Sequence, residues 1–232
     1  KKIPGFNTSL DFEAVEYYLK LNYIPTPKTI YQNTFKLPPA TCLSLDLNTF
    51  EFKSFNSFED LIGSKGISCF NWVDAEQDLN LLDEVNKLDD ESLILKLEDL
   101  LSKSVKSQLI SDVPLGAFLS GGIDSSLIVS LMQKASNDRA KTFTVGFDFL
   151  EYDESKYAER IANHLGTDHT TYRCSEKDFF DLIPNLTEAF SEPFADSSQL
   201  PTMLVSRMAK QKVKVALSGD AGDELFGGYN RY

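Results

Sequence analysis

The stretch that decides the fold is Leu115-Gly116-Ala117-Phe118-Leu119-Ser120-Gly121-Gly122-Ile123-Asp124-Ser125-Ser126. Its apolar first half predicts a buried strand, and a helix is expected to begin directly after the glycines. Two adjacent glycines let the backbone turn sharply and approach an anion without a Cβ in the way. Free N–H groups at a helix start, aided by the helix dipole, hold phosphate oxygens. The stretch therefore predicts a phosphate-binding turn, with the hydroxyls of Ser120, Ser125 and Ser126 as further donors.

Asp124 is the unusual member of this turn, because a carboxylate repels phosphate unless a cation lies between them. Mg²⁺ prefers a carboxylate together with phosphate oxygens, so its presence is expected here. The alternative is an ordinary strand-to-helix turn in which Asp124 caps the helix. The complete string, placed between a buried strand and an amphipathic helix, favours phosphate binding. The turn lacks the lysine of a Walker loop and does not match the G-x-G-x-x-G dinucleotide pattern.

Strands and helices alternate around this turn. Before it, apolar residues at four-residue intervals between Leu93 and Leu109 predict one long amphipathic helix. The expected strands are 115–119, 142–147, 169–173 and 213–217, and the expected helices between them are 125–136, 154–165, 176–190 and 199–211. Short apolar strands separated by helices predict an α/β fold, a parallel sheet with helices on both faces. Ligands of such sheets collect at the carboxyl ends of the strands.

A second candidate site follows the last predicted strand, in Ser218-Gly219-Asp220-Ala221-Gly222-Asp223-Glu224. Three acidic residues within five positions repel one another unless cations or hydrogen-bond donors compensate. A solvated acidic turn is the alternative interpretation. The position at the end of a parallel strand, together with the first turn, favours a metal-phosphate site.

Three residues between the two turns are predicted to have structural roles. Asp153 is expected to cap a helix. His164 and His169 are expected to be structural rather than metal ligands, because neither has an evident partner.

The composition excludes several classes of protein. The formal net charge of −12 counts against a nucleic-acid partner, which requires clustered Lys and Arg. No apolar run approaches the roughly 20 residues that a membrane helix needs. Cys42, Cys69 and Cys174 are few and odd in number, so neither a disulfide framework nor a zinc site is expected, and a cytoplasmic location is predicted.

The chain is expected to contain three parts. Residues 1–55 predict a helix capped by Asp11 and then a strand near 42–47. Residues 56–90 are polar and acidic with weak periodicity, and are predicted to be a linker. The regular alternation fills 91–232. Because neither end matches a natural boundary, the chain is expected to be an excerpt of a longer protein.

Two motifs carry a family resemblance. Ser120–Ser125 resembles the pyrophosphate loop of N-type ATP pyrophosphatases, and the longer string Asp112–Gly122 resembles glutamine-hydrolysing asparagine synthetases. The resemblance implies an adenine nucleotide alpha hydrolase-like (PP-loop ATPase) sheet for 91–232. It also implies that 1–55 is the end of an N-terminal glutaminase domain, because 17–27 and 36–39 resemble that region.

The resemblance also implies the roles of individual residues. Asp124 and Asp223 would share Mg²⁺, and Asp124, Asp220 and Asp223 would serve catalysis. ATP would contact Leu119, Ser120, Gly121, Gly122, Asp124, Ser125, Val145, Ser218 and Gly219, with the backbone at Leu119 and Val145 meeting adenine.

The implied activity is ATP-dependent amide formation. L-aspartate would become L-asparagine through an acyl-adenylate, with ammonia from glutamine and release of AMP and pyrophosphate. No nucleic acid or membrane partner is expected, a homodimer is possible, and the excerpt alone is expected to be inactive because the family's catalytic lysine lies beyond Tyr232.

The chain also departs from the family's pattern. The glutaminase nucleophile, an N-terminal cysteine, is missing. Asp220 and Gly222 replace the glutamate and serine of the best-known bacterial asparagine synthetases, which leaves another acceptor such as a sugar acid open. The two turns would also fit a tRNA-modifying PP-loop enzyme or a non-enzymatic nucleotide sensor.

Overall fold

The structure, a computed structural model, describes residues 4–51, 53, 55–73, 82–147 and 153–229. The chain divides into two compact units. The first contains Lys1–Lys87 and Asn185–Asp196, and the second contains Leu88–Pro184 and Ser197–Tyr232. The chain therefore passes from the second unit into the first and back again between residues 185 and 196.

The first unit begins with α1 (Phe12–Leu21), as the sequence predicts. The Asp11 carboxylate caps this helix by accepting from the backbone N–H groups of Glu13 and Ala14. Such a cap satisfies donors that the first turn leaves without partners. The helix ends at Asn22, which adopts the left-handed conformation that commonly ends helices.

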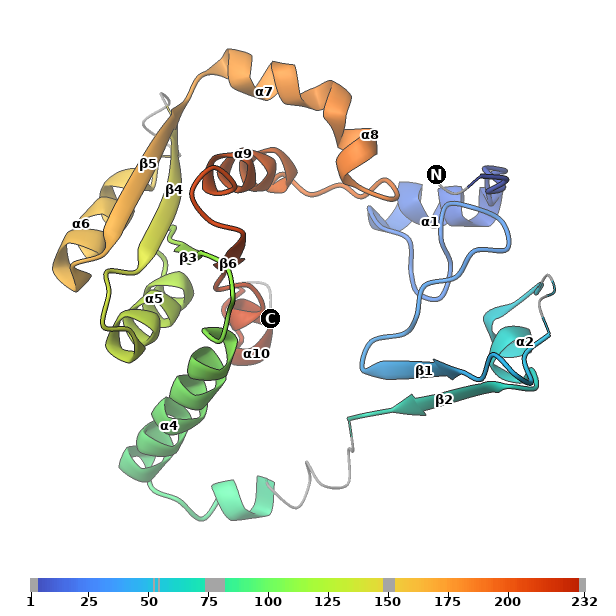
Figure 1. The fold of residues 1–232 in the computed structure, drawn as a ribbon, viewed down its shortest axis with the longest axis horizontal. Coiled ribbons are helices and arrows are strands. Elements are labelled where there is room, and N and C mark those ends of the chain that lie inside the picture. The colour runs from blue at the N-terminus through green and yellow to red at the C-terminus, as the bar shows by residue number, and fades with distance from the viewer. Residues whose placement is uncertain (1–3, 52, 54, 74–81, 148–152, 230–232) are drawn as a thin grey trace. The chain divides into compact units, whose positions relative to one another are not determined.

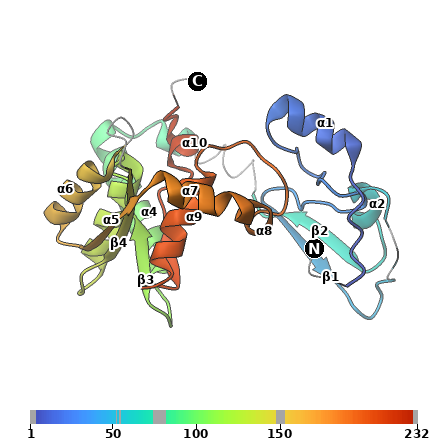
Figure 2. The ribbon, with the colours of Figure 1, turned by 90° about the horizontal axis from the view of Figure 1, so that it is seen from above.

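Residues 56–90, predicted as a linker, contain regular structure in the first unit. They include α2 (Phe58–Ile62) and β2 (Ile67–Asn71), while 74–81 lie outside the described residues. β2 pairs antiparallel with β1 (Thr41–Leu45) to form the ribbon seen in Figure 2. This pairing joins strands that are distant in the sequence, so the local pattern of residues 67–71 gave no signal for it.

The segment 185–196 is fixed within the first unit by a charge pair. The Lys36 ammonium donates to the Ile24 carbonyl oxygen at 2.6 Å and forms an ion pair with Glu192. The second carboxylate oxygen of Glu192 accepts from the Ile30 backbone N–H at 3.3 Å. The two charged side chains are only 29% and 20% exposed, so each depends on the other for solvation.

The second unit is built on a four-stranded parallel sheet, which confirms the predicted fold class. Its strands lie in the order β5-β4-β3-β6. In chain order they are β3 (Leu115–Phe118), β4 (Lys141–Phe147), β5 (Asp168–Cys174) and β6 (Val215–Leu217). Every neighbouring pair is parallel. All four carboxyl ends therefore lie along one edge of the sheet.

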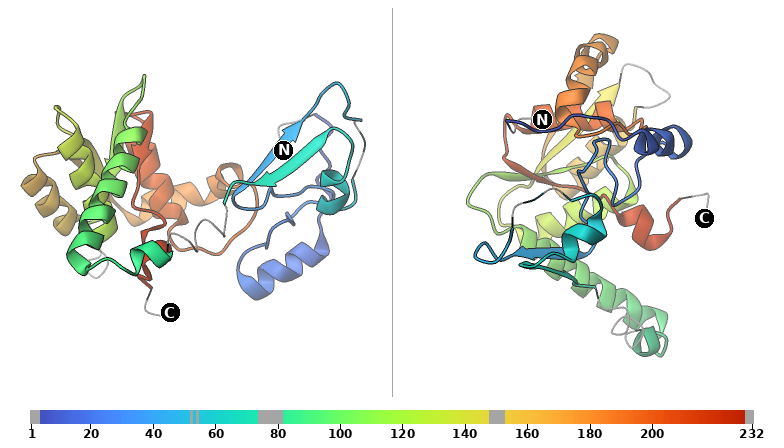
Figure 3. Two further views of the ribbon diagram at one scale, coloured as in Figure 1. Left: turned by 90° about the horizontal axis from the view of Figure 1, so that it is seen from below. Right: turned by 90° about the vertical axis from the view of Figure 1, so that its right-hand side faces the viewer.

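Helices cover both faces of this sheet (Figure 1). The helices of this unit are α4 (Asp90–Gln108), α5 (Ile123–Ala135), α6 (Ser155–Leu165), α7 (Glu176–Leu182), α9 (Gln199–Ala209) and α10 (Gly222–Phe226). α6 and α9 lie on opposite sides of β4, and α4 packs along α5 (Figure 3). The short helix α10 was not predicted from the sequence.

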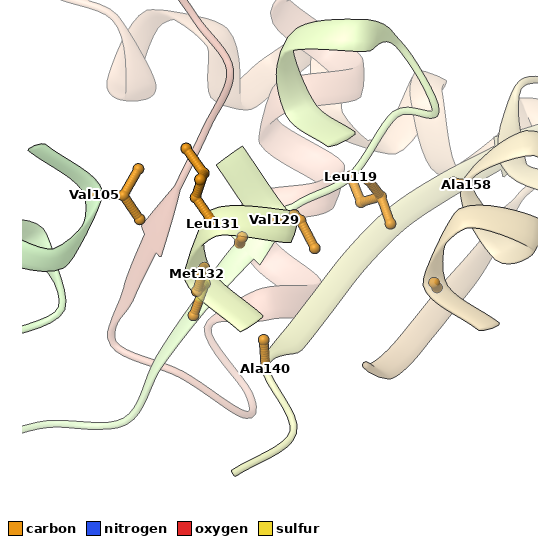
Figure 4. Close-up of a cluster of buried hydrophobic side chains, with 9 residues drawn as sticks. Val105, Leu119, Val129, Leu131, Met132, Ala140 and Ala158 are labelled. Atoms are coloured by element: carbon orange, nitrogen blue, oxygen red, sulfur yellow. The ribbon is translucent and has the colours of Figure 1, made fainter. Parts of the chain in front are cut away.

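Two apolar clusters show that neighbouring residues of β3 point to opposite faces. Ala117 and Leu119 belong to the cluster that α4, α5 and α6 cover, whose side chains appear in Figure 4. Phe118 packs instead against the cluster of Phe143 and the residues of α9. Leu119 and Phe143 are about 1% exposed. Full burial of each such side chain contributes about 1.5–3 kcal/mol.

The helix predicted over 176–190 is wrong as a single element. The structure has α7, then a 3₁₀ turn at Ile183–Asn185, then α8 (Leu186–Ala189). Pro184 lies at the break. Proline lacks the N–H that a helix interior requires, and its ring also restricts the residue before it.

Candidate functional site

The first turn leaves β3 and enters α5 as predicted. The Leu119 backbone N–H donates to the Phe143 carbonyl oxygen at 2.9 Å, which keeps the turn aligned with β4. Gly121 has φ +92°, and a Cβ there would lie 2.8 Å from the Cβ of Tyr157, so the position needs glycine. Gly122 is the N-cap of α5 and has no side chain to cap it. The first N–H groups of this helix are therefore left to a ligand or to water.

The serines of this turn hold its shape. The buried Ser125 hydroxyl accepts from the Ser120 backbone N–H at 3.2 Å and bonds the Ser120 hydroxyl at 3.0 Å. The Ser126 hydroxyl donates to the Gly122 carbonyl oxygen at 2.6 Å. All three hydroxyls predicted as phosphate donors thus make hydrogen bonds within the turn. Their role toward phosphate stays a prediction.

The second turn leaves β6 and packs directly against the first. A Cβ on Gly219 would lie 2.6 Å from the backbone nitrogen of Ser125, and a Cβ on Gly222 would lie 2.5 Å from a carboxylate oxygen of Asp124. Only glycine permits so close an approach at either position. Within the turn, the Ser218 hydroxyl donates to the Asp220 carboxylate at 3.0 Å.

The two turns meet where the order of the strands reverses. From β3 the chain proceeds outward through β4 to β5, whereas β6 lies on the other side of β3. The chain therefore leaves β3 toward one side of the sheet and reaches β6 on the other, and this reversal lies at the carboxyl ends where the two turns meet. In open α/β sheets, ligands bind in the crevice at this position.

A cleft of about 900 Å³ opens there. Its lining includes the residues that the sequence predicted for the site, with two exceptions: Gly121, which instead supports the turn against α6, and Ser126, whose hydroxyl donates to the Gly122 carbonyl oxygen. The predicted lining residues are Leu119, Ser120, Gly122, Asp124, Ser125, Val145, Ser218, Gly219, Asp220 and Asp223.

The cleft also contains residues that sequence reasoning missed. They are Phe118, Ile123, Phe143, Thr144, Phe147, Glu154, Pro201, Thr202, Val205, Phe226 and Gly228. Most are apolar and give the cleft an apolar wall beside its acidic end. The residues from α9 carry no motif, and only the packing of this helix against β4 brings them to the site.

The charge of the cleft is entirely negative among the residues described. Asp124, Glu154, Asp220 and Asp223 line it, and no Lys or Arg of the described chain does. Within the same residues, the carboxylates of Asp124 and Asp223 have neither a hydrogen-bond partner nor an ion-pair partner. A polyphosphate can enter such a cleft only together with cations.

The donor set fits magnesium. In the part of the chain described, no group of three or more His, Cys, Asp or Glu side chains is arranged to hold a metal alone. Mg²⁺ is commonly bound by one or two carboxylates, with substrate phosphates and water completing the octahedron. Two unpaired carboxylates beside a helix start match that requirement.

Asp153, predicted as a helix cap, bonds the start of α6, although Glu154 is the residue at the N-cap position. The Asp153 carboxylate accepts from the Ser155 backbone N–H at 3.1 Å and pairs with Arg173 at 2.7 Å. Burial alone raises the pKa of Asp153, but the hydrogen bonds from Ser155 and Arg173 outweigh burial and hold this pKa at about 2. The side chain is 2% exposed, so the pair fixes the start of α6.

His169 has the structural role that was predicted for it. Its Nδ1 shares a hydrogen bond of 2.8 Å with the Thr142 hydroxyl on the neighbouring strand. Burial lowers the pKa of His169. The ring is therefore held neutral within the sheet, outside the cleft lining.

A parallel sheet, a glycine turn that opens a helix at the reversal point, and an acidic turn packed against it define the class of protein. The chain is an α/β protein whose candidate ligand-binding cleft lies at the point where the strand order of its parallel sheet reverses.

The chain belongs to the asparagine synthase family, whose sequence profile, described as asparagine synthase, matches residues 96–232.

Two curated proteins illustrate this relationship. The chain is 38% identical to the "Putative asparagine synthetase [glutamine-hydrolyzing] 2" of Methanocaldococcus jannaschii, covering 95% of this chain and 39% of that protein. It is 33% identical to "Asparagine synthetase [glutamine-hydrolyzing] 1" of Bacillus subtilis, covering 96% of this chain and 32% of that protein. The chain thus spans 32–39% of the length of these relatives.

Among solved structures, the NH3-dependent NAD synthetase from Campylobacter jejuni is similar, with a TM-score of 0.41 and 15% identity over 59% of this chain and 60% of that chain. A likeness of this size supports no conclusion of its own. In the described parts of the chain, no helix combines the length and the apolar character needed to cross a bilayer.

Proposed function

We propose that this chain is the ATP-binding part of a ligase that converts a carboxylate to an amide through an acyl-adenylate. The acceptor that we favour is L-aspartate, with glutamine-derived ammonia as the nitrogen donor and AMP and pyrophosphate as further products. Residues 91–232 would form the synthetase domain, 1–55 the end of a glutaminase domain, and 56–90 the connection. A cytoplasmic location and a homodimer remain predictions.

One observation supports this proposal more than any other. The two turns identified from the sequence approach so closely that Gly219 and Gly222 have no room for a Cβ against Ser125 and Asp124. Asp124 and Asp223 therefore line one cleft although they follow different strands. Simple nucleotide sensing does not require two unpaired acids beside a phosphate-binding helix start.

The lining of the cleft suggests how ATP would lie. The adenine would meet the backbone at Leu119 and Val145 and the apolar wall beyond them, and the phosphates would reach the uncapped start of α5. The backbone at Ser218 and Gly219 would contact the nucleotide from the second turn. Asp124 and Asp223 would hold Mg²⁺, which would neutralise charge on the pyrophosphate leaving group when bound.

The chain's own residues would serve mainly to position the reactants. An oxygen of the acceptor carboxylate attacks the α-phosphorus of ATP, and the bond to pyrophosphate breaks. Ammonia then attacks the acyl carbon and loses a proton, and AMP leaves with the bonding electrons. The N–H groups at the start of α5 would face the phosphates, and they would stabilise charge there without reorganising during the reaction. Asp220 is the group that we propose to contact the amine or the acceptor.

Another acid, such as a sugar acid, is the second candidate acceptor. Asp220 and Gly222 stand where the best-known bacterial asparagine synthetases have glutamate and serine, and both line the cleft. A different acceptor would therefore be accommodated by this turn. A PP-loop enzyme of another specificity, including one acting on tRNA, is disfavoured by the net charge of −12.

The test uses the intact protein, ATP, Mg²⁺, and glutamine or ammonia, and measures AMP and pyrophosphate with aspartate or other acids. Aspartate-dependent release supports the favoured acceptor, and release with another acid redirects it. Release that requires tRNA, or no release with any acid, refutes the proposal.

A matched pair of variants tests the metal site. Asp124→Asn should lower acid-dependent pyrophosphate release by at least about 100-fold, because charge on the leaving group is no longer neutralised. Asp138→Asn is the control, since Asp138 is exposed in the same unit and does not line the cleft. Circular dichroism should show the same fold for both. Wild-type turnover in Asp124→Asn would mean that the metal assignment is wrong.

A further inference from the structure

Glu154 is an acidic residue of the cleft that the chemistry above does not use. It is the N-cap of α6, the helix that follows β4, and β4 lies directly beside β3 in the sheet. Glu154 lines the same cleft as the glycine turn. Among the residues that the structure describes, its carboxylate has no hydrogen-bond or ion-pair partner.

The backbone at Glu154 is held in place by its neighbours. The Asp153 carboxylate bonds the Ser155 backbone N–H at 3.1 Å and the Arg173 guanidinium at 2.7 Å. The Glu154 carbonyl oxygen accepts from Tyr157 and Ala158 in the first turn of α6. A side chain carried on a fixed helix start is well placed to select one orientation of a ligand.

Thr144 provides an independent observation that points to a ligand. It is 5% exposed, lies in β4 and lines the same cleft. Its hydroxyl makes no hydrogen bond to any residue in the described part of the chain. This oxygen is not among the fully enclosed side-chain atoms that lack a partner in the described residues, so it keeps contact with the cleft and can bond a polar group of a ligand there.

The chemistry of the two side chains limits what that ligand group is. A carboxylate accepts hydrogen bonds and repels phosphate, so within a bound nucleotide Glu154 would meet a neutral donor rather than the phosphates. A hydroxyl donates and accepts. Adjacent ribose hydroxyls supply both functions, and they lie between the base and the phosphates of a nucleotide. Val145 and Phe147 supply an apolar surface for the base in the same cleft.

We propose that Glu154 accepts a hydrogen bond from the ribose diol of the bound nucleotide and that Thr144 adds a second contact to the sugar. The inference rests on the proposed function, because it takes ATP as the nucleotide. In doubly wound sheets that bind dinucleotides, an acidic residue beyond the glycine turn contacts the ribose in a comparable way. In this chain the acidic residue is Glu154, which follows β4, and β4 lies beside β3, the strand that leads into the glycine turn.

The experiment measures equilibrium binding of ATP, 2′-deoxy-ATP and 3′-deoxy-ATP to the intact protein with Mg²⁺ by calorimetry. Wild type should bind at least one deoxy analogue about 10-fold more weakly than ATP, as expected for a hydrogen bond to a charged group. Glu154→Ala should bind ATP about 10-fold more weakly and should bind that analogue and ATP equally. Thr144→Val, which keeps the shape but removes the hydroxyl, should weaken ATP binding about 3-fold. Glu91→Ala, an exposed position on α4, is the control and should match wild type.

The outcomes separate this inference from the proposed function. If wild type binds no ATP, the proposed function itself is refuted. If wild type binds ATP and Glu154→Ala still discriminates against the deoxy analogue by the wild-type factor, only the ribose contact is refuted. Equal binding of all three nucleotides by wild type also overturns the contact.

Discussion

The close packing of the two turns predicts different effects for two glycines of the second turn. Gly219→Ala should mainly lower the stability of the fold, and Gly222→Ala should mainly lower the affinity for Mg²⁺ and ATP. At Gly219 an added Cβ would lie 2.6 Å from Ser125 N and 3.0 Å from Asp124 C, both backbone atoms at the start of α5. At Gly222 the obstacle is instead the Asp124 side chain, with a carboxylate oxygen at 2.5 Å. Backbone in a helix start cannot move aside, whereas a side chain can rotate.

The magnitudes follow from these distances. Carbon atoms pack favourably at about 3.5–4.0 Å, so Gly219→Ala must push the turns apart by roughly 0.5–1 Å. Overpacking of this kind costs about 1–3 kcal/mol, and a rigid obstacle places the variant near about 3 kcal/mol. In Gly222→Ala, an off-rotamer Asp124 costs about 1 kcal/mol of stability. However, this rotation moves the Asp124 carboxylate out of the proposed Mg²⁺ site. The affinity for Mg²⁺ and ATP should therefore fall by about 10-fold or more.

Two measurements on the intact protein test this contrast. Urea unfolding followed by circular dichroism gives the stability, and calorimetry gives the affinity for ATP with Mg²⁺. Gly63→Ala, at a helix end in the first unit with φ −77°, is the control. The reasoning is refuted if Gly219→Ala keeps wild-type stability, or if Gly222→Ala keeps wild-type affinity with Asp124 unchanged.

Two further predictions concern ion pairs. The pKa of Asp153 is about 2 in the folded state, below its usual 3.8, so its contribution to stability is complete above about pH 4 and is lost as the pH falls toward 2. With Arg173 half exposed, this contribution is about 1–2 kcal/mol, and Asp153→Asn should remove the corresponding slope from acid unfolding curves. Glu192→Gln leaves the Lys36 ammonium half-buried without its counter-charge and should destabilise the first unit by about 1–2 kcal/mol in urea unfolding. The exposed pair of Glu16 and Lys20 is the comparison, and Glu16→Gln should leave the stability close to that of wild type; equal losses in the two variants would contradict the role of burial.

Several elements could be predicted because their signals are local. The apolar run Leu115–Leu119 followed by two glycines located β3, its turn and the start of α5 within a few residues. Asp11 and Asp153 were recognised as caps because capping involves residues two or three positions apart. By contrast, the interruption at Pro184 was overlooked, although the proline itself was a local signal against one continuous helix.

The pairing of β2 with β1 and the attachment of 185–196 to the first unit could not be predicted in this way. Both depend on contacts between residues far apart in the sequence, such as Lys36 with Glu192. No periodicity within either segment encodes the partner. The same limit applies to the apolar wall of the cleft, since the residues of α9 reach it only through the packing of that helix on β4.

The sequence by itself determined the types of most elements of the second unit, the glycine-rich character of the first turn and the acidic character of the second, because chain turns and charge density are local properties. Only the tertiary structure decided that the two turns share one cleft, that Glu154 and Thr144 belong to it, and that Ser120, Ser125 and Ser126 make hydrogen bonds within the first turn. The order of the strands brings β6 beside β3, and that order is set by burial of apolar faces across the whole sheet.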